Sequence, residues 1–404
     1  MNYLRKISIG VIFDQDISVG GGYYQAINTM NLLSTIPDSL ADVHYYSLTQ
    51  PAQEIRLSHL NIAYLPVSPF VRLLCSIRQL RWHPRLLSII KLIQPFNPFE
   101  AALIRDKINL VYFVSPSSLS LYLEKLNYVI TVWDLSHRED VEFPEVRDNQ
   151  AFENREAFYR NSLPRSAAII VDSAHSKHLT SFYYGIDKSR IHVIPFQPSF
   201  AVLSSNTSPS SFPLPSTPYV VYPAQFWAHK NHAYIIRTLA LLKTKYNTLI
   251  SAIFLGRDKG NLSFLRQLTN SLDLTNNIFF PGFVSDTEMS AIYSSALALF
   301  MPTYFGPTNL PPLEAFHLGV PVIYPNKPGL KDQVADAAHL VDLSNPDTAA
   351  HSILSLLNQK DLRSSIVSRG SQRLSELSPD TYLNSFVSFL QDYTSRLNSW
   401  PANS

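Results

Sequence analysis

The chain alternates short apolar segments with segments of helical periodicity, and it does so on both sides of a Ser/Pro-rich stretch. Residues 201–218 read AVLSSNTSPSSFPLPSTP, carry no charge and form the clearest linker in the sequence. Before this linker, runs of β-branched and aromatic residues predict strands at Ile7–Phe13, Val43–Ser47, Leu110–Val114, Tyr128–Val132 and Ala168–Val171. After it, similar runs predict strands at Tyr219–Tyr222, Ile250–Leu255, Ile278–Phe280, Leu297–Met301 and Val320–Tyr324. The pattern predicts an α/β protein with two domains, each a parallel sheet covered by helices.

Helical signals fall between these strands. In Tyr23–Leu33 the apolar residues share one helical face, and Asn231–Lys245 shows a similar pattern. Ser285 and Glu288 have the spacing of a capping box and predict a helix start. The length of 404 residues suits two or three domains.

Composition excludes several classes of protein. A single cysteine, Cys75, rules out an internal disulfide framework and a thiolate-rich metal site, and it favours a reducing compartment. Lys and Arg total 33 against 31 Asp and Glu, so we expect no nucleic-acid partner. The apolar run at Ile7–Phe13 is too short for a signal peptide, and prolines interrupt the uncharged stretch 296–313. We therefore expect a cytoplasmic protein without a membrane-spanning helix.

Residues 55–99 contain no Asp or Glu, and cations such as Arg78, Arg81 and Arg85 alternate with leucine and isoleucine. A broken basic amphipathic helix would explain this pattern and would suit the anionic inner face of the plasma membrane. The alternative is a core-packing helix with solvated arginines.

The segment Pro302–Val322, PTYFGPTNLPPLEAFHLGVPV, carries the strongest local signal for a binding site. Pro311 and Pro312 predict a helix start and Gly319 its end. The free N–H groups and positive dipole end of a helix start suit a diphosphate. Glu314, expected in the first turn, can accept hydrogen bonds from two ribose hydroxyls, or it can merely complement the helix dipole.

The segment Tyr222–His232, YPAQFWAHKNH, predicts a strand-to-helix junction. Lys230 at this junction can offset the charge that develops on a leaving diphosphate. His229 and His232 suggest a zinc site, but no third ligand lies nearby, so we expect no metal.

Two further clusters lie in the amino-terminal half. The glycines Gly20, Gly21 and Gly22 follow the first strand, where they allow close backbone approach to a phosphate or a sugar. Downstream, Asp134 can stabilise positive charge and His137 can hold a hydroxyl or move a proton. The alternative is a loop-capping Asp and a surface His.

Together these segments resemble family 4 of the glycosyltransferases, the retaining enzymes of the GT-B fold. The resemblance is strongest over Tyr222–Val341, and the glycine turn and Trp133-Asp134 extend it to the amino-terminal half. It implies two Rossmann-like domains facing across a cleft, with residues 1–200 binding the acceptor and residues 219–378 the nucleotide-sugar donor. It also implies that a helix at 379–397 crosses back onto the first domain.

The resemblance assigns roles to individual residues. Lys230 matches the diphosphate-binding lysine, and Glu314 matches the second member of a paired-glutamate motif, which holds the ribose. The donor-contacting turns correspond to Gly20, Gly21, Gly22, Gly306, Thr308, Asn309 and Leu310.

The sequence departs from the family at three positions. Gly306 replaces the first glutamate of the pair, so Asn309 and Thr308 become the candidates for recognising the donor sugar. Gln225 lies nearest to the place of an arginine partner of the lysine. Trp133 replaces the usual histidine, which makes His137 a candidate replacement.

The subgroup that looks closest makes bacterial surface polysaccharides, including O-antigen chains. The resemblance therefore implies a retaining, metal-independent hexosyltransferase that moves a hexose, mannose being one candidate, to a lipid-linked or oligosaccharide acceptor, with no cofactor beyond the nucleoside diphosphate sugar. Gly306 and Gln225 motivate one alternative, a non-catalytic scaffold that binds nucleotide-sugar or glycan. A GT-B epimerase or phosphorylase is another.

Overall fold

The computed structural model describes residues 6–15, 21–48, 57, 59–79, 97–196, 212–282, 284–306 and 309–399. The predictions for Gly20, Thr308, Arg81, Arg85 and residues 201–211 of the linker lie outside these ranges. The chain divides into two compact units. The amino-terminal unit comprises Met1–Trp133, Glu153–Pro195 and Pro379–Ser404, and the carboxy-terminal unit comprises Asp134–Phe152 and Phe196–Ser378.

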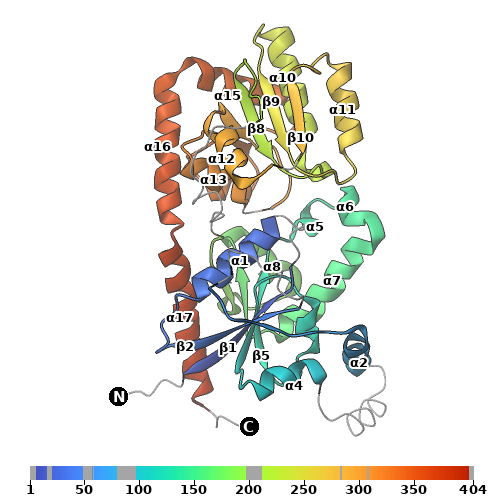
Figure 1. Cartoon of the computed structure of the whole chain (residues 1–404), viewed down its shortest axis with the longest axis vertical. Helices are drawn as coiled ribbons and strands as arrows, with labels where there is room; N and C mark the ends of the chain where they lie inside the picture. Colours follow the sequence, from blue (N-terminus) through green and yellow to red (C-terminus); the bar gives the residue numbers. More distant parts are fainter. Residues whose placement is uncertain are drawn as a thin grey trace. The chain divides into compact units, whose positions relative to one another are not determined.

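The amino-terminal unit contains a seven-stranded sheet of order β3-β2-β1-β4-β5-β6-β7, in which every neighbouring pair is parallel (Figure 1). Its strands are β1 Ile7–Phe13, β2 Ala41–Ser47, β3 Ile62–Tyr64, β4 Leu110–Phe113, β5 Asn127–Val132, β6 Ala168–Val171 and β7 Ile191–Val193. Its longer helices are α1 Gly21–Leu33, α2 Pro69–Gln79, α4 Pro98–Arg105, α7 Ala151–Ser162 and α8 Ala174–Tyr184, with α7 beginning at the last residues of the other unit. Strand order reverses between β1 and β4.

The last helix, α17 (Pro379–Leu397), belongs to the amino-terminal unit although it comes from the far end of the chain. It contacts α1, and the ring of Phe386 stacks on Tyr112 of β4 with ring centroids 5.3 Å apart. Five of its aromatic and leucine side chains, Tyr382, Phe386, Phe389, Leu390 and Tyr393, are buried in the core of this unit. Burial of this apolar face holds the helix on the sheet.

The carboxy-terminal unit contains a six-stranded parallel sheet of order β10-β9-β8-β11-β12-β13 (Figure 1). Its strands are β8 Tyr219–Pro223, β9 Ser251–Leu255, β10 Ile278–Gly282, β11 Ala298–Phe300, β12 Val322–Pro325 and β13 His339–Val341. Its helices include α5 Ser136–Glu139, α6 Pro144–Arg147, α10 His232–Lys245, α11 Leu262–Ser271, α12 Asp286–Ser294, α13 Leu310–His317, α14 Leu330–Val334, α15 Pro346–Asn358 and α16 Lys360–Glu376. Strand order reverses between β8 and β11, and this switch point places the loops after these two strands side by side.

The predicted parallel α/β class is confirmed, because each predicted strand overlaps a strand of the structure. Strands such as β9 are buried at every residue, as expected of a sheet covered on both faces. The capping box is confirmed too, since the Ser285 hydroxyl accepts the Glu288 N–H at 3.3 Å. Among the described residues, no helix has the length and apolar character needed to cross a membrane.

Candidate functional site

Lys230 lies in the loop that leaves β8 at the switch point of the carboxy-terminal sheet. Residues Ala228–Lys230 form one 3-10 turn, and Asn231 follows with a φ of 56° before α10 begins. Asn tolerates this left-handed conformation better than most residues, so the sequence Lys-Asn suits the turn. The Lys230 side chain is partly buried at the carboxyl edge of the sheet, where a ligand of such a fold is expected.

His229, the residue before Lys230, joins three loops. Its N–H donates to Glu145 Oε1 at 2.8 Å, and its Nδ1 pairs with the same oxygen. Its carbonyl oxygen accepts the Tyr304 N–H at 2.9 Å, and its ring stacks on Phe305 with centroids 4.2 Å apart. The turn that carries Lys230 is therefore fixed by α6 on one side and by the loop after β11 on the other.

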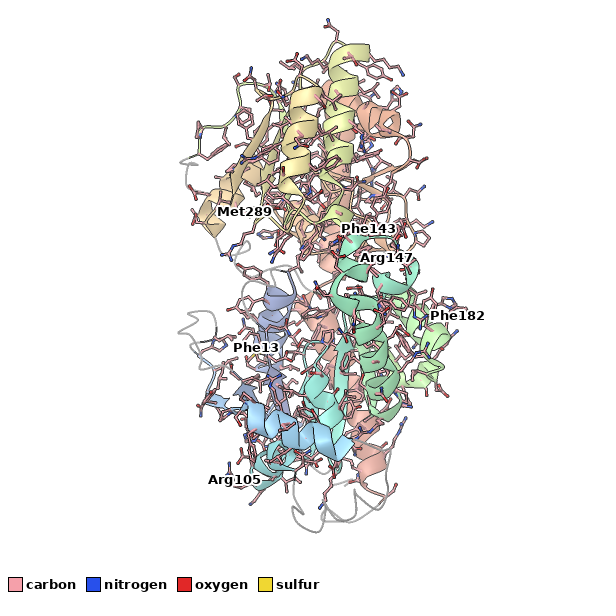
Figure 2. All side chains as sticks on the ribbon, turned by 90° about the vertical axis from the view of Figure 1, so that its right-hand side faces the viewer. Phe13, Arg105, Phe143, Arg147, Phe182 and Met289 are labelled. Carbon is pink, nitrogen blue, oxygen red and sulfur yellow. The ribbon has the colours of Figure 1, made fainter. Side chains whose placement is uncertain are left out.

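Residues Asp134–Phe152, from the first half of the sequence, are part of the carboxy-terminal unit. Asp140 forms an ion pair with Lys327, and the Ser136 hydroxyl accepts the Gly306 N–H at 3.4 Å. Phe143, labelled in Figure 2, packs on Tyr304 and Phe305 with ring centroids 5.1 Å away in both cases. Sequence reasoning missed these contacts. The only feature of the sequence that could have indicated these contacts is the acidic residues of this segment, and such residues usually mark a solvated loop.

The charges around Lys230 follow from burial and from two carboxylates. Burial lowers the pKa of Lys230 to about 8, while Asp134 and Glu145 act to raise it. Burial lowers the pKa of His229 to about 4 against the opposing effect of Glu145, so its ring is neutral at pH 7. Burial alone would raise the pKa of Glu145, but the hydrogen bonds from His229 lower it, so this carboxylate is charged. The site thus combines one ammonium group with two carboxylates.

The histidine pair does not form a metal site in the described part of the chain. His232 is fully buried among the rings of Tyr222, Phe226 and Phe254, and burial lowers its pKa to about 3. His229 is bound to Glu145, and no group of three potential metal ligands occurs among the described residues. The surroundings of both histidines therefore favour a structural role over metal binding.

The loop after β11 is held by Asn309. Its Nδ2 donates to the Gly306 carbonyl at 2.7 Å and to the Tyr324 hydroxyl at 2.7 Å. Its own N–H donates to Gln333 Oε1 at 2.9 Å, and its carbonyl accepts from Gln333 Nε2 at 2.6 Å. In this structure the amide nitrogen and main-chain N–H of Asn309 are engaged within the protein. The predicted contact of Asn309 with the donor would require these bonds to be exchanged.

The start of α13 differs from the expectation in two respects. The helix begins at Leu310, so Glu314 is its fifth residue and lies beyond the first turn; the predicted first-turn position is wrong. Pro311 and Pro312 carry no N–H, which leaves Leu310 as the main-chain donor at the tip of the helix. Glu314 is partly buried and accepts a hydrogen bond from the Tyr293 hydroxyl at 3.4 Å. The predicted helix end is confirmed, with Gly319 at a φ of +66°.

In the amino-terminal unit, α1 begins at Gly21. A Cβ atom on Gly22 would lie 2.4 Å from the indole ring of Trp133, whereas a Cβ on Gly21 would meet nothing within 4 Å. Gly22 is therefore required by the close packing of Trp133 against the helix. Gly21 remains open to a ligand.

Asp134 and His137 lie around the start of α5. Asp134 Oδ1 accepts the Ser136 N–H at 2.9 Å, and Asp134 also acts electrostatically on Lys230. His137 is fully buried with its ring edge-on to Phe152, so the alternative of a surface histidine is wrong. In this structure His137 presents no surface to a substrate, whereas Asp134 remains partly exposed.

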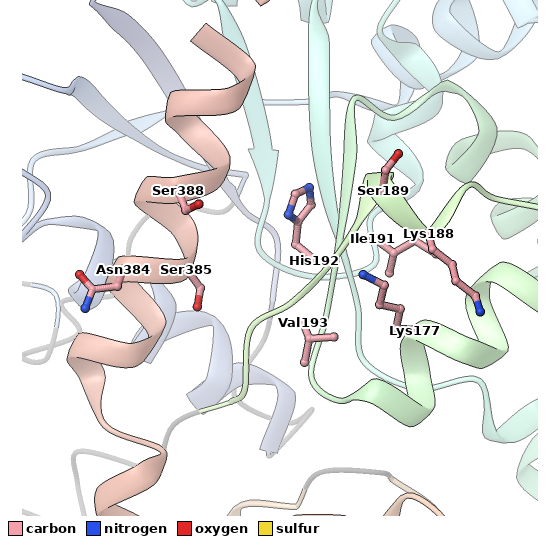
Figure 3. A pocket seen from close by; sticks show the side chains of 9 residues that line it. All are labelled: Lys177, Lys188, Ser189, Ile191, His192, Val193, Asn384, Ser385 and Ser388. Carbon is pink, nitrogen blue, oxygen red and sulfur yellow. The ribbon is translucent and has the colours of Figure 1, made fainter. Parts of the chain in front are cut away.

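A hollow of about 520 Å³ opens in the amino-terminal unit between β7 and α17 (Figure 3). It is lined by Lys177, Lys188, Ser189, Ile191, His192, Val193, Asn384, Ser385 and Ser388. Cations, hydroxyls and an amide thus line it without a carboxylate. None of the residues predicted to bind the donor is among them.

Residues 206–373 match the family model described as glycosyl transferases group 1. O-antigen chain mannosyltransferase B of Escherichia coli is 26% identical over 152 residues, which cover 38% of this chain and 40% of that protein. O-antigen chain mannosyltransferase RfbU of Salmonella typhimurium is 31% identical over 121 residues, which cover 30% of this chain and 32% of that protein. The matched region thus spans less than half the length of either relative.

Among solved structures, Anabaena HepE in complex with UDP-glucose aligns with a TM-score of 0.67 at 15% identity, covering 97% of this chain and 99% of that chain. At this identity the likeness shows the fold, which is GT-B. The family match falls on the unit that holds Lys230, Gly306 and Glu314. Residues 206–373 of this chain therefore match the group 1 glycosyl transferases, and the whole chain has the GT-B fold of the family that its motifs resemble.

Proposed function

We propose that this protein is a retaining hexosyltransferase that moves a hexose, with mannose as the candidate sugar, from a nucleoside diphosphate sugar to a lipid-linked or oligosaccharide acceptor in surface polysaccharide synthesis. One observation carries the proposal: in a group 1 domain, Lys230 and the loop before α13 follow the two strands at the switch point of the sheet. This is where an α/β sheet binds its ligand. The choice of mannose and of the O-antigen pathway is supported by the two partial relatives.

In the proposed reaction the bond between the anomeric carbon and the diphosphate oxygen breaks, and the acceptor oxygen bonds to that carbon on the same face. The acceptor proton passes to the departing phosphate oxygen. Lys230 and the N–H of Leu310 stabilise the charge on the diphosphate, so no dedicated metal is needed. Asp134 stabilises the positive charge that develops on the sugar, and Glu314 holds the ribose.

The carboxy-terminal domain would bind the donor and the amino-terminal domain the acceptor. The hollow between β7 and α17 supports the second assignment, because its hydroxyl, amide and ammonium groups can hydrogen-bond to a glycan. Peripheral contact with an anionic membrane through residues 55–99 would bring a lipid-linked acceptor within reach. Within that segment, α2 exposes Phe70 and Leu73 beside the exposed Arg72.

A panel of nucleoside diphosphate sugars, including UDP-glucose and GDP-mannose, tests the proposal. A bound donor should raise the unfolding temperature, because ligand binding to the folded state stabilises it. With acceptor oligosaccharide present, that donor should then release free nucleoside diphosphate. Donor binding without any release would favour the scaffold motivated by Gly306 and Gln225, and conversion of the sugar without acceptor would favour an epimerase.

A further inference from the structure

We propose that Glu145 is a positioning residue for the transfer reaction: through His229 it fixes the turn that carries Lys230, and it adds a negative charge to the surroundings of that lysine. The inference rests on the proposed function, in which Lys230 meets the diphosphate. It concerns a residue 84 positions away from His229 in the sequence.

The first support is geometric. Oε1 of Glu145 accepts a hydrogen bond from the main-chain N–H of His229 at 2.8 Å. The same oxygen also pairs with the ring nitrogen Nδ1 of His229. Both side chains are largely buried, with exposures of 11% for Glu145 and 12% for His229. A carboxylate that holds both the backbone and the ring of one residue fixes the peptide that leads directly into Lys230.

The second support is that Glu145 is itself firmly held. Phe143, two residues earlier, packs on Tyr304, Phe305 and the His229 ring. The ion pair between Asp140 and Lys327 attaches the same segment to the loop after β12. Glu145 therefore acts from a fixed position, as a residue that orients another group must.

The third support is electrostatic. The titratable groups that act on Lys230 are the carboxylates of Asp134 and Glu145 and the rings of His229 and His232. Both rings are neutral at pH 7, so among the described residues it is the two carboxylates that favour the ammonium form against burial. Because the pKa of Lys230 is only about 8, the loss of one carboxylate would leave a large share of neutral amine near pH 7.5.

The test uses the full chain with Glu145→Gln, which keeps an oxygen to accept the His229 N–H but removes the charge. Glu142→Gln is the matched control, because Glu142 lies on the same segment and is exposed. Calorimetric titration with UDP, GDP, ADP, CDP and dTDP first identifies the nucleoside diphosphate that binds. Its affinity is then measured between pH 6 and 10 for each variant.

In the wild type the affinity should fall as the pH rises through the pKa of Lys230. In Glu145→Gln the midpoint of this fall should move down by about one pH unit, while Glu142→Gln should keep the wild-type profile. Adding Lys230→Arg to Glu145→Gln should remove the fall, because arginine stays charged throughout this range. An unchanged midpoint in a folded Glu145→Gln variant would overturn the inference.

Other outcomes separate the inference from the proposed function. If none of the five diphosphates binds, or if Lys230→Ala binds as tightly as the wild type, the diphosphate-binding role of Lys230 fails and the inference fails with it. If Lys230→Ala weakens binding but Glu145→Gln leaves the pH profile unchanged, only the inference fails.

If Glu145→Gln does not fold, Glu145→Asp replaces it, because aspartate keeps the charge but has a shorter side chain. Glu145→Asp should bind more weakly at every pH but should keep the wild-type midpoint of the fall in affinity. If that midpoint moved down by about one pH unit, as expected for Glu145→Gln, the inference would be overturned.

Discussion

The Asn309 side chain, just before α13, donates to the Gly306 carbonyl oxygen over 2.7 Å. Gly306 adopts a φ of +89°, and a Cβ at this position would lie 3.0 Å from Asn309 Oδ1. The backbone at Gly306 therefore suits a residue without a side chain. A glutamate, which the resemblance to the family would place here, would be strained in this backbone conformation.

Gly306→Ala should accordingly destabilise the protein, by about 1–2 kcal/mol from the left-handed backbone alone. Gly260→Ala is the control, because its φ is +101° but a Cβ there meets nothing within 4 Å. Chemical denaturation should show the larger loss for Gly306→Ala. Equal losses would mean that the contact with Asn309 contributes nothing. We expect Gly306→Glu, which introduces the glutamate that the resemblance implies, to lower stability without a gain in activity.

Alanine substitutions at Gly22 and Gly21 give a second prediction, in which Gly21→Ala is the control. Gly22→Ala places a methyl group 2.4 Å from the Trp133 ring and should cost about 1–3 kcal/mol of unfolding free energy. Gly21→Ala meets no atom within 4 Å and should be neutral or slightly stabilising, since alanine favours helices. Combining Gly22→Ala with Trp133→His should recover much of the loss. Equal stability of the two single variants would contradict the packing described for Trp133.

Lys230→Ala should lower turnover by about a hundredfold, because it removes the cation that stabilises the departing diphosphate. Lys230→Arg should retain more activity and lose the decline above about pH 8 that deprotonation of the wild-type lysine causes. Steady-state rates across pH with the donor identified by the panel measure both effects. Wild-type rates in Lys230→Ala would remove this residue from the site.

Glu314→Ala should raise the dissociation constant of the donor at least about tenfold, which corresponds to about 1.4 kcal/mol. The reason is the loss of hydrogen bonds to the ribose. Tyr293→Phe, which removes only the hydroxyl bonded to Glu314 Oε2, should have a smaller effect. Calorimetric titration distinguishes the two variants, and unchanged affinity in Glu314→Ala would refute the ribose role.

A triple change to Ser should reduce co-flotation of the protein with anionic liposomes when it is made at Arg78, Arg81 and Arg85. The reason is that each cation near an anionic membrane surface contributes to the attraction between protein and membrane. Changing Phe70 and Leu73 to Ser should act in the same direction, since these side chains are 67% and 57% exposed. Phe182→Ser is the control for a lost exposed aromatic ring, at 71% exposure on α8. Undiminished flotation would leave the basic segment as ordinary structure.

Local sequence patterns predicted the regular elements well and their edges poorly. Long apolar runs such as Ile7–Phe13 coincide with strands because burial on both faces leaves a continuous signal. The strands β3, β7 and β13 were missed, and each has only three residues at the edge of its sheet. So few residues show no reliable periodicity. Glu314 lies just beyond the first turn rather than within it, because the helix begins at Leu310, before the prolines.

The sequence alone determined the parallel α/β class, the capped helix starts and the position of Lys230 at a strand-to-helix junction, since the strands and helices behind them show in patterns of neighbouring residues. Only the tertiary structure decided that Glu145 holds His229, that Trp133 lies on Gly22 and that Asn309 is engaged inside its own loop. The first two contacts join residues far apart in sequence, and all three depend on how side chains fill the space between loops. The spacing of residue types along the chain therefore does not predict these contacts.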